Sequence, residues 1–263
     1  MLTVKEGAGM IWYDKYGENV SNAIMFLHGT NFVHCFSKQT AYFARKCQVI
    51  VPHLPGFGRS SDLIFSADLA VEQAAEIAKS IKHPVTLVGF SLGAQLCLPL
   101  MCRHGELFNG IIMISPWLIK DIAEIERYMR YQANNEKAMR NGVSGFSAWL
   151  SRLERQEHRE FCQSVSMRSI LASIDNGLLL SDYPDYAGVE KPIMAICGMK
   201  ETTNMRRSVR ELAHQNPNCV YEIWDGAGHN IPLRFAPRLN KTIESFTEKI
   251  ASENKLLKGI DIS

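Results

Sequence analysis

The sequence predicts an α/β fold: a mostly parallel central sheet flanked by helices, with a helical segment inserted between two strands. Three observations predict it. Short, continuously apolar runs such as residues 23–27 and 110–114 are typical of strands that are buried on both faces. These runs alternate with amphipathic stretches of helical period, such as residues 67–81. Between residues 117 and 185 the strand-like runs stop, and helix-forming, more charged sequence takes their place.

The predicted elements follow one another from the first β-rich patch, residues 9–16, which indicates an edge strand or a hairpin arm. Strands are expected at residues 23–27, 48–51, 85–88, 110–114, 192–197 and 219–224, and helices at residues 36–46, 67–81, 94–101, 205–215 and 236–252. Because strands and helices alternate, the sheet should be mostly parallel with right-handed crossovers. The tail after residue 255 is expected to be loosely held.

The expected organisation is a core made of residues 1–116 and 186–263, interrupted by a helical insertion at residues 117–185. Within the insertion, apolar residues such as Ile122, Ile125 and Met129 recur at helical spacing. Two interpretations are open for it: extra helices packed on the sheet, or a mobile helical cap.

Composition excludes several classes of function. The 263 residues can bury a large core, and a formal net charge of +2 gives no reason to expect nucleic acid or an anionic membrane as a partner. No apolar run reaches the ~20 residues that a bilayer-spanning helix needs, and the N-terminus lacks the pattern of a signal peptide. The seven scattered cysteines favour reduced thiols and a cytoplasmic location. Since no metal-binding motif occurs, we expect neither a metal nor a cofactor.

Residues 89–93 fit the pattern G-x-S-x-G, with Ser91 at its centre. The pattern is short and occurs by chance, and its simplest interpretation is a glycine-rich turn with a serine at a helix N-cap. Its context favours a nucleophile, because an apolar run precedes it and a helical stretch follows. Such a strand-to-helix turn strains the backbone, lifts the hydroxyl clear of the sheet and places helix N–H groups beneath it.

Four polar residues each follow a predicted strand directly: His28, Ser91, Glu201 and His229. The carboxyl ends of parallel strands meet at one edge of a sheet, where reactive groups gather. The sequence therefore predicts that these residues lie in one site.

Four local patterns together resemble the α/β-hydrolase fold family over about residues 10–250. They are His-Gly-Thr-Asn at 28–31, Leu-Pro-Gly-Phe-Gly-Arg-Ser-Ser at 54–61, G-x-S-x-G at 89–93 and Gly-Ala-Gly-His at 226–229. In the family the triad runs in the order serine, acid, histidine, and Ser91, Glu201 and His229 follow that order. The resemblance specifies the insertion least.

The resemblance implies Ser91 as nucleophile and His229 as the base that takes its proton and returns it to the leaving group. The acid usually lies in a Gly-x-x-Asp turn, which here ends in Glu201. Asp121, soon after the preceding strand, is the rival acid, and Asp225 is a third possibility that we favour less.

For the oxyanion hole, the resemblance implies the backbone N–H groups of Leu92 and Thr30, with His28 supporting the loop. His53 stands where the family commonly has aspartate, so we expect a local change in hydrogen bonding there rather than lost activity. The remaining histidines have no motif around them and are expected at the surface or at helix ends: His34, His83, His104, His158 and His214.

The expected function is a serine hydrolase that cleaves a carboxylic ester or related acyl substrate, of the carboxylesterase class, with a small acyl molecule as its partner. The aromatic residues Trp117, Tyr128, Phe146 and Trp149 either line an apolar acyl pocket or pack the insertion onto the core. A nucleophilic serine argues against dehalogenase chemistry, which uses an aspartate in this fold.

Two groups of alternatives remain. The chain could be a ligand-binding or scaffold member of the fold with little turnover. It could also run another reaction of the fold: thioesterase, lactonase, carbon–carbon bond hydrolase, perhydrolase or aminopeptidase. The last would need acidic groups for a free amino terminus, for which Glu124 and Glu126 are the nearest residues.

Overall fold

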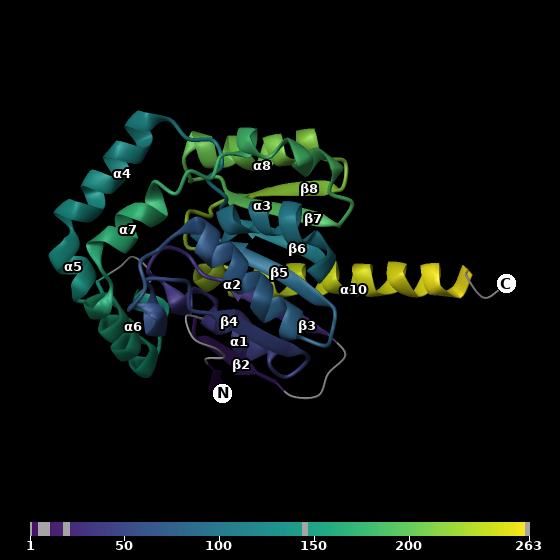
Figure 1. Ribbon diagram of the computed structural model, residues 1–263, viewed down its shortest axis with the longest axis horizontal. Helices are drawn as coiled ribbons and strands as arrows, with labels where there is room; N and C mark the ends of the chain where they lie inside the picture. Colours follow the sequence, from purple (N-terminus) through teal and green to yellow (C-terminus); the bar gives the residue numbers. More distant parts are fainter. Residues whose placement is uncertain (1, 5–10, 18–21, 144–146, 261–263) are drawn as a thin grey trace.

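The computed structural model describes residues 2–4, 11–17, 22–143 and 147–260 (Figure 1). Its centre is a sheet of eight strands in the order β1-β2-β4-β3-β5-β6-β7-β8. β2 pairs antiparallel with both β1 and β4, and strands β3 to β8 pair parallel with one another. The strands are β1 Leu2–Val4, β2 Tyr13–Tyr16, β3 Ala23–Leu27, β4 Gln48–Pro52, β5 Val85–Phe90, β6 Phe108–Ile114, β7 Ile193–Gly198 and β8 Cys219–Trp224.

The mostly parallel sheet flanked by helices is thus confirmed. The flanking helices are α1 Ser37–Phe43, α2 Ala67–Ser80, α3 Leu92–His104, α8 Thr203–Gln215, α9 Ile231–Arg234 and α10 Ala236–Ile260. Helices α2, α3 and α8 pack their apolar residues on one face of the sheet, and α1, α9 and α10 pack on the other. Because helices cover both faces of the sheet, every residue of β3 and β5 is buried, and Thr86 is the one polar residue among them.

Of the two interpretations of residues 9–16, the hairpin arm is confirmed: β2 is not the edge of the sheet, because β1 pairs antiparallel with its outer side. Several element ends differ from expectation. α10 continues to Ile260, beyond the predicted end at residue 252. Short 3₁₀ helices complete the described chain: η1 Val33–Phe36, η2 Gly58–Ser60, η3 Gly105–Leu107, η4 Ser147–Trp149, η5 Leu180–Asp182 and η6 Pro184–Gly188.

Between β6 and β7 the chain forms α4 Ile122–Asn134, α5 Glu136–Arg140, α6 Arg152–Ser164 and α7 Met167–Ile174. Figure 1 shows these helices together at one end of the molecule, away from the free end of α10. The described residues of 117–185 contain helices and no strand. Ile170 and Ile174 of α7 are buried and belong to the core cluster that covers α2 and α3, so the insertion is packed onto the core through α7.

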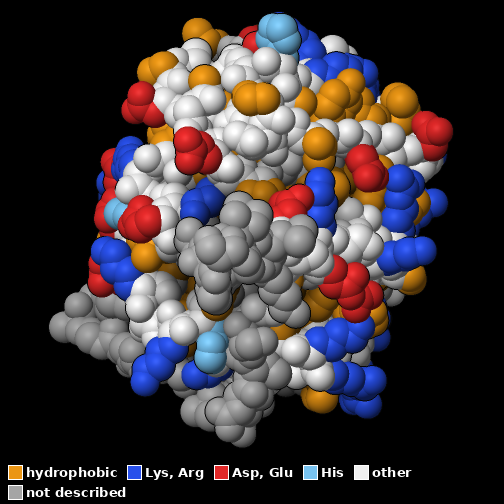
Figure 2. All heavy atoms as spheres, turned by 90° about the vertical axis from the view of Figure 1, so that its right-hand side faces the viewer, with side chains coloured by type: hydrophobic (Ala, Val, Ile, Leu, Met, Phe, Trp, Pro, Cys, Tyr) orange, Lys and Arg blue, Asp and Glu red, His pale blue; other side chains and the backbone are white. Residues whose placement is uncertain are grey.

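Charged side chains of both signs are interspersed on the face shown in Figure 2. None of the helices in the described residues is long and apolar enough to cross a membrane.

The turn between β5 and α3 holds Ser91 at φ +53°, a left-handed backbone that non-glycine residues rarely adopt. The flanking glycines make this turn possible. A Cβ on Gly89 would overlap the carbonyl oxygen of Gly93, and a Cβ on Gly93 would overlap the carbonyl oxygen of Leu27 in β3. The backbones therefore approach each other more closely than any side chain would permit.

We expect Gly93→Ala to lower the free energy of unfolding by about 3 kcal/mol, because the added Cβ collides with backbone that cannot move aside. Gly105→Ala at the end of the same helix is the matched control. No atom lies within 4 Å of its added Cβ, and its φ of −58° suits alanine, so it should be neutral or stabilise by about 0.5 kcal/mol. Urea unfolding of both variants measures this, and equal effects would contradict the close-approach argument.

Candidate active site

Three side chains from three separate loops form one chain of hydrogen bonds. His229 Nε2 lies 3.0 Å from Ser91 Oγ, and His229 Nδ1 lies 2.6 Å from Glu201 Oε1. An ionised carboxylate can only accept, so Nδ1 carries the proton that is donated to Glu201. Nε2 is then the acceptor for the Ser91 hydroxyl. The structure thus brings together the three residues that the sequence places in the triad, in the tautomer that a general base needs.

Glu201 is buried at the end of β7, where its second carboxylate oxygen is fully engaged. Oε2 accepts hydrogen bonds from the Gly198 N–H (2.6 Å), the Cys197 thiol (2.9 Å) and the Ser115 hydroxyl (3.1 Å). Burial alone would raise the pKa of Glu201, but the hydrogen bonds and charge of His229, together with these donors, hold that pKa below its usual value. Glu201 is therefore ionised and fixed in orientation.

The two rival acids lie elsewhere. Asp121 is the N-cap of α4, and its Oδ1 accepts a hydrogen bond from the Glu124 N–H at 2.7 Å. Asp225 is exposed in the turn after β8. Of these carboxylates, Glu201 is the one that contacts His229.

The two oxyanion-hole candidates flank Ser91 from different elements. Leu92 is the first residue of α3, where a backbone N–H has no carbonyl partner within the helix. Thr30 lies in the turn after β3 and lines the same cavity as Ser91. Its hydroxyl accepts a hydrogen bond of 3.2 Å from Ser173 on α7, so the insertion touches this loop directly.

His28 supports the loop, as expected. Its ring spans from the Gly29 carbonyl (2.7 Å from Nδ1) to the Leu54 N–H (3.1 Å from Nε2). Burial lowers the pKa of His28 to about 3, so the ring is neutral and ties the turn after β3 to the loop after β4.

A cavity of about 470 Å³ opens above Ser91 between the core and the insertion. It is lined by Thr30, Ser91, Gln95, Trp117, Glu124, Arg127, Tyr128, Tyr131, Ser173, Ile174, Lys200, Glu201, Thr202, Met205 and His229. Of the four aromatic residues considered from sequence, Trp117 and Tyr128 line it. Trp149 packs against the core cluster around α1 and α10, and Phe146 lies outside the described residues.

Among the described residues, no three His, Cys, Asp or Glu side chains are grouped in a way that could hold a metal ion. What the site offers is a serine hydroxyl hydrogen-bonded to an imidazole, and a buried carboxylate hydrogen-bonded to the other nitrogen of that ring. A comparison of sequences assigns its family: the profile of the alpha/beta hydrolase family matches residues 24–240. The chain belongs to the alpha/beta hydrolase family.

Individual relatives of this alpha/beta hydrolase are distant. An (E)-2-((N-methylformamido)methylene)succinate hydrolase from Acinetobacter baylyi is 21% identical over 258 residues, covering 90% of this chain and 93% of the relative. A biotin biosynthesis bifunctional protein from Teredinibacter turnerae is 28% identical over 116 residues, and the match spans only 17% of its length. The enol-lactonase from Burkholderia xenovorans has a TM-score of 0.74 at 16% identity, over 90% of this chain and 95% of that one. At such identities, the structural likeness shows the fold.

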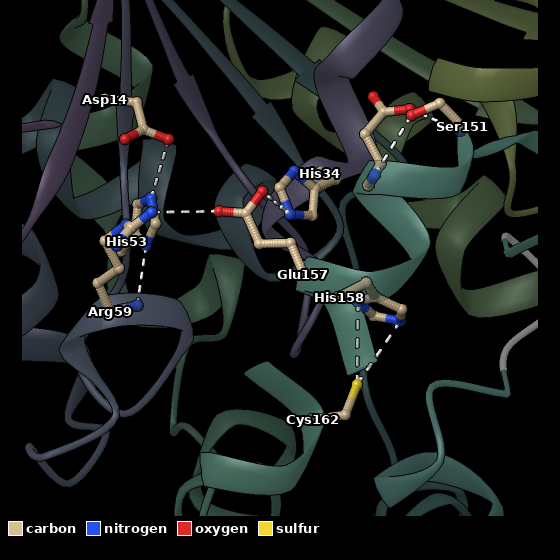
Figure 3. Close-up of polar contacts among 9 residues, drawn as sticks. Asp14, His34, His53, Arg59, Ser151, Glu157, His158 and Cys162 are labelled. Carbon is tan, nitrogen blue, oxygen red and sulfur yellow. Dashed lines mark hydrogen bonds and ion pairs between the residues drawn. The ribbon is translucent and has the colours of Figure 1, made fainter. Parts of the chain in front are cut away.

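The loop after β4 of this hydrolase is braced by a histidine in place of an aspartate (Figure 3). His53 Nε2 donates to Asp14 of β2 at 3.1 Å, and its Nδ1 accepts the Arg59 N–H at 2.9 Å. The expected change in hydrogen bonding is therefore present, with Asp14 supplying the carboxylate from another strand. Glu157 of α6 then contacts both Arg59 (3.3 Å) and His34 (3.4 Å), which ties the insertion to this loop.

The expectation that the remaining histidines lie at the surface or at helix ends is wrong for His158, which is buried in the middle of α6, whereas His34 lies in the last turn of η1. His34 is half-buried against α6, where its ring stacks on Phe161 at 5.5 Å. His158 is buried and meets the Phe32 ring edge-on at 5.0 Å. His158 is buried and His34 is half-buried because α6 docks onto the turn after β3, a contact that no local sequence motif predicts.

Sequence reasoning also missed several residues of the site. Ser115 follows β6 directly, just as Ser91 follows β5, so its position at a strand end was the available signal. Cys197 lies inside an apolar strand, and Arg127 is one of several charged residues on α4. No sequence pattern around Cys197 or Arg127 indicated that either residue belongs to the site.

We expect the free energy of unfolding to fall as pH is lowered from about 7 to about 5. Burial lowers the pKa of His28 to about 3, and burial with the neighbouring His34 lowers that of His158 to about 4. Between these values and the ordinary pKa of about 6.5, the unfolded chain binds more protons than the folded one, so stability is lost as pH falls. Each buried histidine should contribute a loss of about 2 kcal/mol at pH 5.

Denaturant unfolding of the wild type and His158→Phe at both pH values measures this effect. The variant should lose less stability at the lower pH by about 2 kcal/mol. His214→Gln removes an exposed histidine and should behave like the wild type. An unfolding free energy that does not change with pH would contradict the neutral, buried state of both rings.

Proposed function

We propose that this alpha/beta hydrolase is a serine esterase, which cleaves a carboxylic ester of a small molecule through an acyl-enzyme on Ser91. The observation that carries the proposal is the hydrogen-bond chain from Ser91 through His229 to Glu201, which opens into a cavity whose surface is mostly apolar. A serine hydroxyl is a weak nucleophile without an adjacent base, and this arrangement supplies one.

In the first half-reaction the Ser91 oxygen attacks the ester carbonyl while His229 Nε2 takes the hydroxyl proton. The imidazolium that forms is stabilised by the ionised Glu201 beside Nδ1. His229 then gives the proton to the departing alkoxide, the carbon–oxygen bond of the ester breaks, and the acyl group stays on Ser91.

In the second half-reaction a water molecule replaces the alcohol. His229 takes a proton from the water, the resulting hydroxide attacks the acyl carbon, and the Ser91 oxygen leaves with the proton that His229 returns. In both halves the negative carbonyl oxygen is held by the backbone N–H groups of Thr30 and Leu92. One such donor typically stabilises a transition state by about 3 kcal/mol.

Relatives do not define the substrate. The Acinetobacter baylyi relative is named as a succinate-derivative hydrolase and the Burkholderia xenovorans neighbour as an enol-lactonase, so their reactions differ. The ester proposal for this chain rests on its own residues.

We expect a fluorophosphonate to modify the wild type at Ser91, since an activated serine forms a stable phosphonyl adduct. Intact-mass measurement followed by peptide mapping locates the adduct, and Ser91→Ala should remain unmodified. Ser61, a serine in the loop after η2, serves as the control, and Ser61→Ala should be labelled like the wild type.

Folded wild type that takes up no label and hydrolyses no ester would overturn the esterase proposal. The chain would then be a ligand-binding member of the family, and ligand screening would replace kinetics.

Glu201→Gln should lower kcat by about 10³–10⁴, because an amide presents the wrong partner to Nδ1–H and loses the charge that stabilises the imidazolium. Asp121→Asn is the matched control: asparagine caps a helix as well as aspartate, so α4 is kept. Its ester hydrolysis should stay within about twofold of the wild type. Loss of activity in Asp121→Asn with little change in Glu201→Gln would reassign the acid.

A further inference from the structure

Two cationic side chains line the same cavity as Ser91. Arg127 comes from α4 of the insertion, and Lys200 comes from the turn after β7 in the core. Both are exposed to solvent. In the part of the chain that the structure describes, neither side chain has a hydrogen-bond or ion-pair partner.

The carboxylates of the cavity are, in contrast, already engaged. Glu124 Oε2 accepts hydrogen bonds from Trp117 Nε1 (3.1 Å) and Asn204 Nδ2 (2.6 Å), which join α4 to α8. Glu201 is occupied by His229 on one oxygen and by Ser115 and its own turn on the other. The charged side chains of the cavity without a side-chain hydrogen-bond partner among the described residues are therefore the two cations.

The surface of the cavity is mostly apolar, and Trp117, Tyr128, Ile174 and Met205 are among its lining residues. Such a wall favours an aliphatic or aromatic spacer and offers little to a charged group next to the ester. A guanidinium binds a carboxylate through two parallel hydrogen bonds, and an ammonium adds a compact charge.

We propose that the substrate of this site is an ester that carries a carboxylate away from the bond to be cleaved, held by Arg127 and Lys200. This rests on the proposed esterase function and adds the substrate class to it. The recognition is local, because the formal net charge of the chain is only +2. At physiological ionic strength, interactions between exposed charges are largely screened beyond about 8 Å.

The test compares kcat/KM for two matched pairs of esters. In the first pair the charge is on the acyl side: the 4-nitrophenyl monoester of adipic acid against the same ester with the free acid as its amide. In the second pair it is on the alcohol side: the hexanoate ester of 4-hydroxybenzoic acid against that of 4-hydroxybenzamide. Within each pair, shape and length are nearly the same and the charge differs.

The wild type should prefer the anionic ester in at least one pair by about tenfold, and Arg127→Gln or Lys200→Gln should each lower that ratio about threefold to fivefold. Arg130→Gln is the control. It removes the same charge from an exposed position on α4 outside the cavity lining, so the ratio should stay at the wild-type value. The pair that shows the preference locates the carboxylate on the acyl or the alcohol side.

Failure of the proposed substrate class and failure of the proposed esterase function give different results. A wild type that hydrolyses both members of each pair equally well overturns the substrate class and leaves the esterase proposal standing. An equal loss of ratio in Arg127→Gln and Arg130→Gln overturns the role of these two side chains, because it indicates a general charge effect. A wild type that hydrolyses none of the esters and takes up no fluorophosphonate overturns the function and the substrate class together.

Discussion

The left-handed backbone of Ser91 is the constraint on which the site depends. The chain must leave β5, reverse within one residue and begin α3 while passing in contact with β3, and only glycine at positions 89 and 93 leaves room for that passage. The strain is held by neighbouring hydrogen bonds: the Ser91 N–H donates to the Ile114 carbonyl and the Gly93 N–H to the His28 carbonyl. One turn therefore fixes the serine hydroxyl and the first N–H of α3 with respect to β3 and β6.

The orientation of the Glu201 carboxylate is a second geometric requirement of the site. Glutamate has one more methylene than the aspartate usual in such a turn, so its carboxylate needs more contacts to hold one orientation. Gly198, Cys197 and Ser115 supply them, and Ser115 itself adopts a left-handed φ of +55° directly after β6. Its hydroxyl reaches Glu201 because β6 and β7 are neighbours in the sheet. The longer acid is thus paired with a serine on the adjacent strand.

How much of this could be predicted from sequence depends on whether the signal is local. The strand-turn-helix around Ser91 and the strand-end positions of Glu201 and His229 are local patterns, and the structure brings these residues together. Ser115 and Cys197 could not be assigned to Glu201, because that contact exists only once β6 and β7 are paired. His158 was misplaced for a similar reason: in the sequence it lies on a highly charged helix, and its burial comes from docking of α6 on Phe32.

Two parts of the chain line the cavity. Ser91, Glu201 and His229 come from the strand ends of the core, whereas Trp117, Arg127, Tyr128 and Ile174 come from residues 117–185. The insertion is joined to the core by particular contacts: Ser173 to Thr30, Glu157 to Arg59 and His34, and Cys162 to Asn31 at 3.4 Å. Two of these contacts are to the loop that carries the oxyanion candidate Thr30. The elements that would select the substrate therefore also help to hold a group that would stabilise the transition state, so a change in α6 or α7 should alter turnover as well as binding.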